Sequence, residues 1–247
     1  MKSASYSKQF SDHFIAGLKA GVPVGIGYVP IAVAFGLMAA NAGLSPGEII
    51  LMSIVVFAGA SQFIAVQMLA AGASLLGIVI TVFIVNLRHL LMSASLSLRI
   101  KEASALTLAL LSFGITDESF AVASLDKRSK LPVSFLCGLN LLGYASWVGG
   151  TVIGTMTGAL LPEFVQQSMG VALYAMFIGL LIPASRTSIK VATVAVTGAV
   201  LNWFFQYWLE QGWALIMAAL AGAAVGAFLS EDEFTKEENK PVEEALS

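Results

Sequence analysis

Long apolar stretches fill most of the chain and are separated by short joints that contain glycine, proline or charged residues. A helix that crosses a bilayer needs about 20 mainly apolar residues. The pattern therefore predicts helical segments at residues 15–40, 48–70, 74–98, 103–125, 131–158, 164–183, 188–208 and 211–229. We expect an all-α fold, a polytopic transmembrane helical bundle of about eight segments.

Composition narrows the class of protein further. Of the 247 residues, 57% are hydrophobic and 11% are charged, whereas charged residues make up about 25% of a typical soluble domain. The expected surroundings are membrane lipid, and the formal net charge of −2 argues against a nucleic-acid partner. The single cysteine, Cys137, cannot form an internal disulfide, and the two histidines provide no metal-ligating cluster. We expect neither a metal nor a cofactor.

The distribution of polar residues divides the chain into a polar N-terminal segment at 1–14, a transmembrane domain at 15–229 and an acidic C-terminal tail at 230–247. The N-terminal segment has no short apolar region followed by a cleavage site, so the first span is expected to direct insertion. Basic loops remain in the cytoplasm, and most Lys and Arg residues fall on one side of an eight-span count. This distribution predicts that both termini are cytoplasmic.

Two basic residues contradict that count. Arg99 and Lys101 follow the third segment and fall on its outer side. Either their loop is an exception to the rule that basic loops stay inside, or one segment between residues 48 and 125 does not cross the membrane fully.

The first segment contains Pro23 and Pro30 together with five glycines. Proline removes a backbone hydrogen-bond donor, so we expect helix breaks at these two positions. Discontinuous helices are common in transporters, because unwound backbone can bind cargo inside a cavity. The alternative is that the glycines serve close helix packing.

A faint internal repeat relates residues 15–125 to residues 131–229. Its matched positions are separated by about 120 residues: Gly17 and Gly138, Gly36 and Gly154, Phe57 and Phe177, Asn86 and Asn202. Membrane transporters are often built from such duplicated halves, either parallel or inverted. The pattern leaves both arrangements open.

Three polar islands interrupt the apolar segments of the first half. They are Ser61-Gln62, Asn86-Leu87-Arg88-His89 and Thr116-Asp117-Glu118. An arginine at the centre of a lone membrane helix costs about 2.5 to 3.5 kcal/mol, so one is retained where it faces a partner, water or cargo. If the islands lie at similar depth, Asp117 or Glu118 supplies the counter-charge of Arg88.

These residue types fit a zwitterionic cargo. The expected substrate-binding residues are Arg88 for a carboxylate, Asp117 or Glu118 for an ammonium group, and Ser61, Gln62 and Asn86 as neutral hydrogen-bonding groups. Proton coupling is expected from His89, Asp117 or Glu118. The structural alternatives are a buried ion pair that fixes helix register, interhelical hydrogen bonds at Ser61 and Gln62, and a histidine that only packs.

Four sequence motifs carry a family resemblance. GVPVGIGYVPIAVAFG at 21–36, FAGASQF at 57–63, NLRH at 86–89 and TDESFA at 116–121 resemble the AzlC family, the large subunit of bacterial branched-chain amino acid export systems. The resemblance implies a transport domain at 15–229 that exports valine-like or leucine-like amino acids across the inner membrane. It also implies a much smaller AzlD-type membrane subunit as partner. The Gly/Ala-rich stretch at 218–226 could receive such a helix, or an internal one.

Two other functions compete with this one. An intramembrane serine hydrolase would use Ser61 as nucleophile and His89 as base, although position 62 is Gln rather than the Gly of the matching protease motif. A passive pore or purely structural subunit would need none of the charged residues for function. The expectation is that the chain is not an enzyme.

Overall fold

The computed structural model describes residues 2–100, 103–157, 178, 181–182, 185–186, 188–209 and 211–238. Within these residues the regular secondary structure is helical, which confirms the predicted all-α class. The chain forms two compact units: unit 1 comprises residues 1–73 and 82–173, and unit 2 comprises residues 74–81 and 174–247. The boundaries of these units differ from those of the expected halves.

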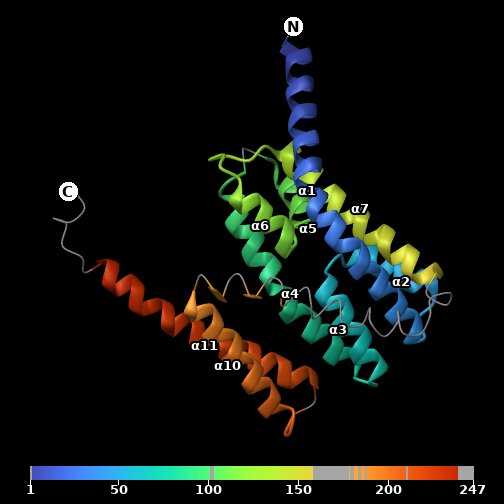
Figure 1. Cartoon of the computed structure of the whole chain (residues 1–247), viewed down its shortest axis with the longest axis vertical. Helices are drawn as coiled ribbons and strands as arrows, with labels where there is room; N and C mark the ends of the chain where they lie inside the picture. The colour runs from blue at the N-terminus through green and yellow to red at the C-terminus, as the bar shows by residue number, and fades with distance from the viewer. Residues whose placement is uncertain are drawn as a thin grey trace. The chain divides into compact units, whose positions relative to one another are not determined.

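Unit 1 contains the first seven helices (Figure 1). They are α1 (Lys2–Asn41), α2 (Pro46–Val55), α3 (Gly59–Ala70), α4 (Leu75–Ser97, of which residues 82–97 belong to unit 1), α5 (Ala105–Phe113), α6 (Asp117–Leu125) and α7 (Val133–Thr157). Among the described residues, three stretches are long and apolar enough to span a membrane: Lys8–Asn41, Leu75–Ser97 and Val133–Thr157.

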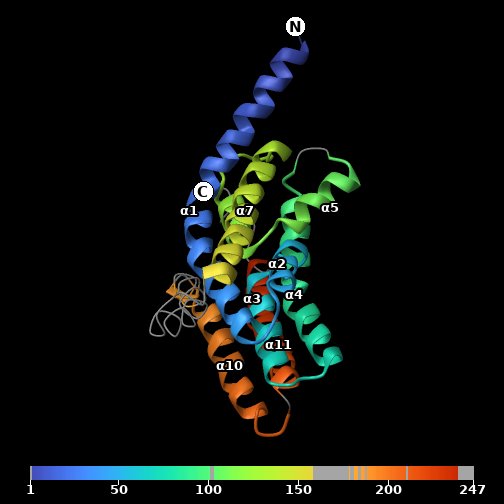
Figure 2. The same ribbon diagram turned by 90° about the vertical axis from the view of Figure 1, so that its right-hand side faces the viewer.

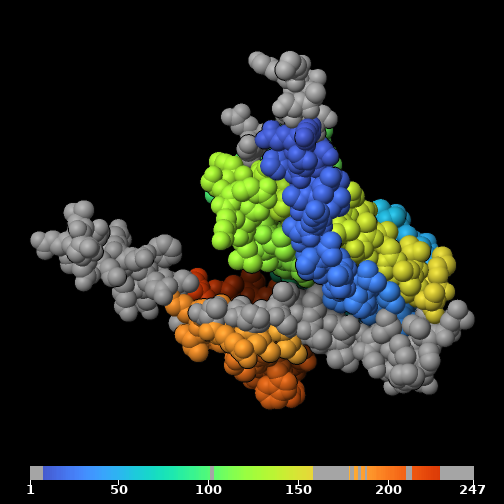
Figure 3. Space-filling view, turned by 45° about the horizontal axis from the view of Figure 1, so that its top comes forward, coloured from blue at the N-terminus to red at the C-terminus, as the bar shows by residue number. Residues whose placement is uncertain are grey.

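Helices α1 and α7 form the frame of unit 1 and run side by side in the same direction (Figures 1 and 2). A Cβ atom added at Gly17 would lie 2.0 Å from the carbonyl oxygen of Phe135, and one added at Gly154 would lie 2.1 Å from that of Val33. The two backbones therefore touch near both ends of the helix pair. In the space-filling view α1 (blue) and α7 (yellow) adjoin (Figure 3). This contact supports the alternative in which the glycines serve close packing.

The helix breaks expected at Pro23 and Pro30 are absent, and that prediction was wrong. α1 is continuous from Lys2 to Asn41 with both prolines inside it. A proline leaves one carbonyl of the preceding turn without its helical donor. In this structure α1 packs against α7 and remains helical at both Pro23 and Pro30.

Breaks occur instead in the segments predicted at 48–70 and 103–125. Each is a pair of short helices rather than one crossing: α2 and α3 are joined through residues 56–58, and α5 and α6 through residues 114–116. The axes of α5 and α6 differ by 117°. A pair bent in this way is either one broken span or a re-entrant loop, and the sequence had left open whether a segment between residues 48 and 125 crosses the membrane fully.

The α5–α6 hairpin begins and ends at the same side of unit 1. Arg99, just after α4, donates hydrogen bonds of 2.6 to 3.1 Å to four carbonyls after or near the end of α6, those of Ala123, Ser124, Asp126 and Arg128. Lys130 Nζ also donates to the carbonyl of Leu98 at 2.8 Å. We call this side, formed by residues 98–100 and 126–131, the basic end. Arg99 thus lies beside the basic loop, which removes its conflict with the charge rule.

The basic end also holds a local ion pair outside the apolar segments. Arg128 binds Asp126, with 2.6 Å between Nη2 and Oδ2. The hydrogen bonds from the Arg128 side chain lower the pKa of Asp126 to about 2. Arg128 also lies over the ring of Phe135 at the start of α7, with its Cζ 4.2 Å from the ring centroid.

The α2–α3 hairpin begins at the end of unit 1 that lies opposite the basic end. α2 follows the end of α1, and α3 leads through residues 71–74 into α4, which runs back to the basic end. Gln62 in the first turn of α3 donates to Ser53 of α2 at 3.0 Å, so the two helices fold against each other. A spanning helix followed by a hairpin thus occurs twice with opposite direction, as α1–α3 and α4–α6.

Unit 2 contains α10 (Ile189–Phe205) and α11 (Gln211–Glu238), which pack together. A Cβ atom added at Gly222 would lie 3.7 Å from the Cα atom of Gly198, so the Gly/Ala-rich face of α11 is covered by α10. α11 continues to Glu238, which makes the first part of the acidic segment helical. The predicted segment at 164–183 lies almost entirely outside the described residues.

Candidate functional site

The three polar islands meet along α4, at the level where both hairpins turn. Ser61 at the start of α3 donates to Oδ1 of Asn86. Arg88 pairs with Asp117 at the start of α6. His89 Nδ1 lies 2.8 Å from the carbonyl oxygen of Ile115, at the break between α5 and α6. Of the two counter-charges considered for Arg88, Asp117 is the one that pairs with it.

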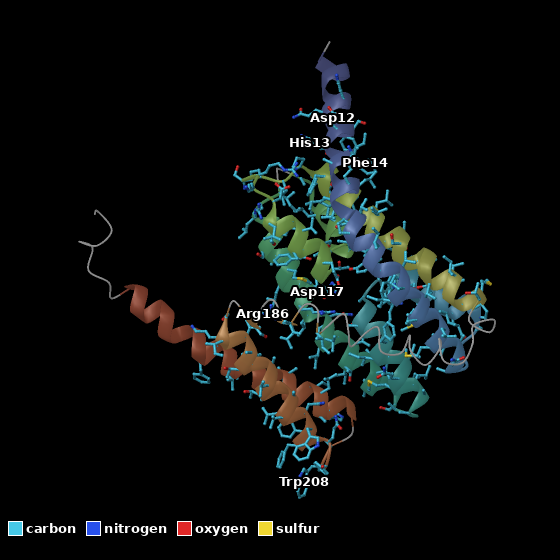
Figure 4. All side chains as sticks on the ribbon, in the orientation of Figure 1. Asp12, His13, Phe14, Asp117, Arg186 and Trp208 are labelled. Carbon is cyan, nitrogen blue, oxygen red and sulfur yellow. The ribbon has the colours of Figure 1, made fainter. Side chains whose placement is uncertain are left out.

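The two acidic residues occupy the first turn of α6 (Figure 4 labels Asp117). Thr116 is the N-cap residue: its hydroxyl accepts from the backbone N–H of Ser119 at 3.3 Å, and the Ser119 hydroxyl accepts from the N–H of Thr116 at 2.9 Å. This capping box starts α6 directly after the break. The positive end of the helix dipole then stabilises the carboxylates of Asp117 and Glu118.

The ion pair between Arg88 and Asp117 is close but accessible. Arg88 Nη1 lies 2.7 Å from Asp117 Oδ2, and the two side chains are 32% and 31% exposed within the protein. Arg88 Nε is buried and has no hydrogen-bond partner. The guanidinium group therefore keeps an unused donor next to a carboxylate that a ligand can approach.

Glu118 is held from α1 by a residue that sequence reasoning missed. The hydroxyl group of Tyr28 donates to the Glu118 carboxylate and lies 2.6 Å from Oγ1 of Thr116. Tyr28 is 5% exposed, and its ring packs edge-on against Trp147. Tyr28 is a polar aromatic residue between two prolines in an apolar segment. This position could have marked it as a site residue. Tyr28 thus connects the frame to the charged end of α6.

His89 presents one nitrogen without a partner. A carbonyl oxygen only accepts hydrogen bonds, so Nδ1 carries the proton in its bond to Ile115. Nε2 is buried and has no hydrogen-bond partner. Nε2 is therefore the atom of His89 that can accept a proton or a hydrogen bond.

Gln62 belongs to a different, buried network. Its Oε1 accepts from the Trp147 indole N–H at 2.9 Å, and its Nε2 donates to Ser53, whose hydroxyl lies 2.8 Å from that of Thr151. Gln62, Ser53 and Thr151 are each 0% exposed. The structure places Gln62 in the joint between α2, α3 and α7 rather than beside the ion pair, so its bonds are those of a packing residue.

The geometry does not support a nucleophile and base at Ser61 and His89. Ser61 donates to Asn86, and His89 bonds to the Ile115 carbonyl. No hydrogen bond between the two side chains occurs in the described part of the chain. A serine hydrolase requires that contact, or one water in its place.

The comparisons with known proteins agree with the membrane architecture. The model of the AzlC protein family matches residues 23–161, which include both hairpins and every residue of the ion-pair site. The chain is 38% identical to the inner membrane protein YgaZ of Escherichia coli over 75% of this chain and 79% of the relative. It is 33% identical to an uncharacterized membrane protein of Archaeoglobus fulgidus over 92% of this chain and 100% of the relative.

A third relative carries a functional name. The branched-chain amino acid transport protein AzlC of Bacillus subtilis is 27% identical over 64% of this chain and 62% of that protein. No solved structure gives a significant match. Because the family model covers more than half of the chain, from within α1 to beyond α7, the resemblance carried by the four motifs is confirmed: this chain is a membrane protein that belongs to the AzlC family.

Proposed function

We propose that this protein exports branched-chain amino acids of the valine and leucine type across the bacterial inner membrane. The observation that carries the proposal is the accessible Arg88–Asp117 ion pair at the level where both hairpins turn. Membership of the AzlC family supports amino acid transport, and the name of the Bacillus subtilis relative supports the branched-chain class.

A zwitterion can replace this ion pair charge for charge. The substrate carboxylate would bind the Arg88 guanidinium, whose fork of donors fits two carboxylate oxygens. The substrate ammonium group would bind Asp117. The internal salt bridge is exchanged for two equivalent ones, so neither partly buried charge is left without a partner.

The apolar side chain of the substrate would rest on an aromatic cluster formed by one residue near each hairpin turn and one residue of α7. The rings of Phe57, Phe113 and Tyr144 pack with centroid separations of 5.1 to 6.2 Å. Apolar pockets that contain a few oriented polar groups are typical of small-molecule sites. Asn86, and Ser61 through Asn86, would orient the polar end of the substrate.

Proton antiport would drive export through the groups next to the ion pair. Glu118 and the free Nε2 of His89 are the candidate proton carriers, and Asp117 is the third. Protonation of Asp117 would weaken its hold on both Arg88 and the substrate ammonium group, which would release cargo.

The orientation follows from the basic end. Arg99, Lys127, Arg128 and Lys130 lie there. By the rule for basic loops this end faces the cytoplasm, together with the N-terminus. A cytoplasmic C-terminus and a small AzlD-type partner subunit complete the proposal, and both rest on the sequence pattern and the family.

The test is efflux of preloaded valine, leucine and lysine from cells that express the chain with and without a small AzlD-type subunit. Arg88→Ala and Asp117→Asn should each lower valine and leucine efflux more than about tenfold at matched abundance, which corresponds to more than about 1.4 kcal/mol. Arg128→Ala is the matched control, because it breaks a second Arg–Asp pair outside the apolar segments.

Two outcomes would contradict the proposal. A passive pore or structural subunit predicts that Arg88→Ala keeps wild-type efflux wherever it assembles. Efflux of lysine equal to that of valine would contradict the substrate class. Proton coupling is tested separately: Glu118→Gln should retain exchange of valine across the membrane but lose net efflux driven by a pH gradient.

A further inference from the structure

Four aromatic side chains gather in unit 2 where α10 turns into α11. Each combines an apolar ring with one polar atom, and each is exposed: Trp203 is 62%, Tyr207 68%, Trp208 78% and Trp213 47% exposed. The ring centroids of Trp203 and Tyr207 lie 5.3 Å apart, so these two rings pack on each other. Figure 4 labels Trp208 at the tip of the hairpin. We call these four residues the aromatic turn.

The backbone that carries these rings has a defined conformation. α10 ends at Phe205, and the chain continues in a hydrogen-bonded turn. The N–H of Tyr207 donates to the carbonyl of Phe204 at 3.2 Å, and the N–H of Trp208 donates to that of Phe205 at 3.0 Å. The rings are therefore held at the end of the hairpin rather than on a long loop.

The polar atoms of the aromatic turn differ from that of the buried tryptophan. The indole N–H of Trp147, which is 2% exposed, donates to Gln62. Among the residues that the structure describes, the side chains of Trp203, Tyr207 and Trp208 form no hydrogen bond with one another or with a neighbour. An exposed ring with an unused donor fits surroundings that are apolar on one side and supply acceptor oxygens on the other.

The hairpin has the dimensions and the ends of a membrane hairpin. α10 has 17 residues, which makes it about 26 Å long, and the hydrocarbon core of a bilayer is about 30 Å thick. Its middle exposes aliphatic side chains such as Val196 and Val200. Basic residues lie at its start, where Figure 4 labels Arg186, and the aromatic turn lies at its other end. This order is typical of a helix that runs from the cytoplasm to the opposite interface.

We propose that the aromatic turn binds the phospholipid headgroup layer of the outer leaflet. The rings would rest against the first part of the acyl chains, and their N–H and O–H groups would donate to ester and phosphate oxygens. Lipid is the occupant that fits, because the rings continue the exposed aliphatic surface of α10 in a chain that belongs to a membrane protein family. The basic residues place the start of α10 in the cytoplasm and the turn on the outer side.

The contact would set the depth of unit 2 in the bilayer. With 17 residues, α10 is at the lower limit of the length that crosses the hydrocarbon core. Aromatic residues at the interface anchor such a short helix against movement along the membrane normal. The proposal uses no residue of the ion-pair site and does not depend on transport.

Tryptophan fluorescence tests the contact directly. Trp203→Phe with Trp213→Phe leaves Trp208 and Trp147, and adding Trp208→Phe leaves Trp147 alone, so the difference between these two variants reports Trp208. The full chain is measured in nanodiscs of phosphatidylcholine that is spin-labelled on the headgroup or midway along an acyl chain, and with acrylamide in the water. We expect the headgroup label to quench Trp208 at least about twofold more than the acyl-chain label.

Thiol labelling of whole cells tests the leaflet and the depth. In a Cys137→Ser background, Gln206→Cys at the end of α10 should react with an impermeant reagent from outside, and Ser188→Cys at its start only after the cells are opened. Adding Trp203→Leu and Trp208→Leu removes two indole donors and should slow the reaction of Gln206→Cys by about threefold or more, as the turn moves toward the hydrocarbon. Phe228→Leu is the matched control, because Phe228 is 72% exposed but has no donor.

Four results would overturn the proposal. Stronger quenching of Trp208 by the acyl-chain label would place the ring in the hydrocarbon, and quenching by acrylamide alone would place it in water. Protection from all three quenchers would mean that protein, either a partner subunit or a second copy, covers the turn. Reaction of Gln206→Cys only after the cells are opened would exclude the outer leaflet.

Discussion

The hairpins α2–α3 and α5–α6 both turn at a phenylalanine, and the rings of Phe57 and Phe113 pack with their centroids 6.2 Å apart. Their returning helices begin differently. α3 starts at Gly59 after Ala58, which makes no side-chain cap, whereas α6 is capped by Thr116. Ser61 and Gln62 in the first turn of α3 are neutral and fully buried, but α6 begins with two carboxylates.

This difference separates two functions that the sequence pattern presents together. The polar groups of α3 have partners within the protein, so they join the first hairpin to α7 and α4. The side chain of Asp117 is about one-third exposed and forms an ion pair with Arg88. We infer that the first hairpin is a fixed wall and that the second carries the chemistry.

The largest effect concerns the direction of the hairpins. In a Cys137→Ser background, Ser104→Cys and Lys127→Cys should react with an impermeant thiol reagent from one side of the membrane only, because both flank α5–α6. Ala42→Cys and Ala73→Cys, which flank α2–α3, should react only from the other side. Reaction of Ser104→Cys and Lys127→Cys from opposite sides would show that α5–α6 is a single crossing. It would contradict the description of α2–α3 and α5–α6 as two comparable hairpins.

The next effect distinguishes structural from functional polarity. Gln62→Leu leaves the buried indole N–H of Trp147 without an acceptor, which costs about 1 to 3 kcal/mol. We expect a lower midpoint in thermal unfolding monitored by tryptophan fluorescence, with efflux per folded molecule retained. Asp117→Asn should give the opposite result, with efflux lost and a smaller change in unfolding. Equal loss of efflux in both variants would place Gln62 in the transport site.

Tyr28→Phe tests how the frame controls the second hairpin. The change removes the hydroxyl that binds Glu118 but keeps the ring against Trp147. A hydrogen bond to a charged group contributes about 1.5 to 3 kcal/mol, so we expect efflux to fall at least several-fold and its pH profile to shift. Tyr144→Phe, which removes a hydroxyl bonded to the Ile54 carbonyl, is the control on the first hairpin. An unchanged pH profile in Tyr28→Phe would exclude a role for this bond in setting Glu118.

Ala58→Ser would make the first hairpin resemble the second. A serine N-cap can accept from the free N–H groups in the first turn of α3 and stabilises a helix by about 0.5 to 2 kcal/mol. We expect a higher thermal midpoint and unchanged efflux. Lower stability would indicate that the uncapped start of α3 already has another partner.

The smallest effect is the pH dependence of the loop that closes the second hairpin. Asp126 has a pKa of about 2 in the folded protein, below its ordinary value of about 3.9. Its pairing with Arg128 therefore stabilises the folded state above about pH 4 and ceases to do so as the pH falls through 2. The contribution of an exposed pair is below about 1 kcal/mol. The stability difference between wild type and Asp126→Asn should vanish at low pH, and a constant difference would contradict this origin.

The fold class and the ion pair of Arg88 followed from the sequence because their physical cause is local. A buried arginine in an apolar segment requires a counter-charge, and the third polar island offered Asp117 and Glu118 as the two candidates. The position of Gln62 did not follow, since it depends on Trp147, which is 85 residues away in the chain. Tyr28 was missed for the same reason, because its partner Glu118 is 90 residues distant.

The positions of the helix breaks show where local rules fail. Pro23 and Pro30 favoured a break in α1, yet α1 lies against α7 from Gly17 to Gly36 and continues through both prolines. The actual breaks, at Phe57 and around Gly114, contain no proline. At the first of them Phe57 adopts a φ of 38°, which is rare for a residue other than glycine. The neighbouring sequence gives no signal that predicts this conformation. Reading 48–70 and 103–125 as full crossings also created the conflict at Arg99.

The network around Gln62 has a consequence for how the chain is made. Ser53 and Gln62 emerge from the ribosome well before Thr151 and Trp147, with which they bond. Within a bilayer no water can take the place of those partners. The first hairpin therefore completes its hydrogen bonds only after α7 has been synthesised and inserted.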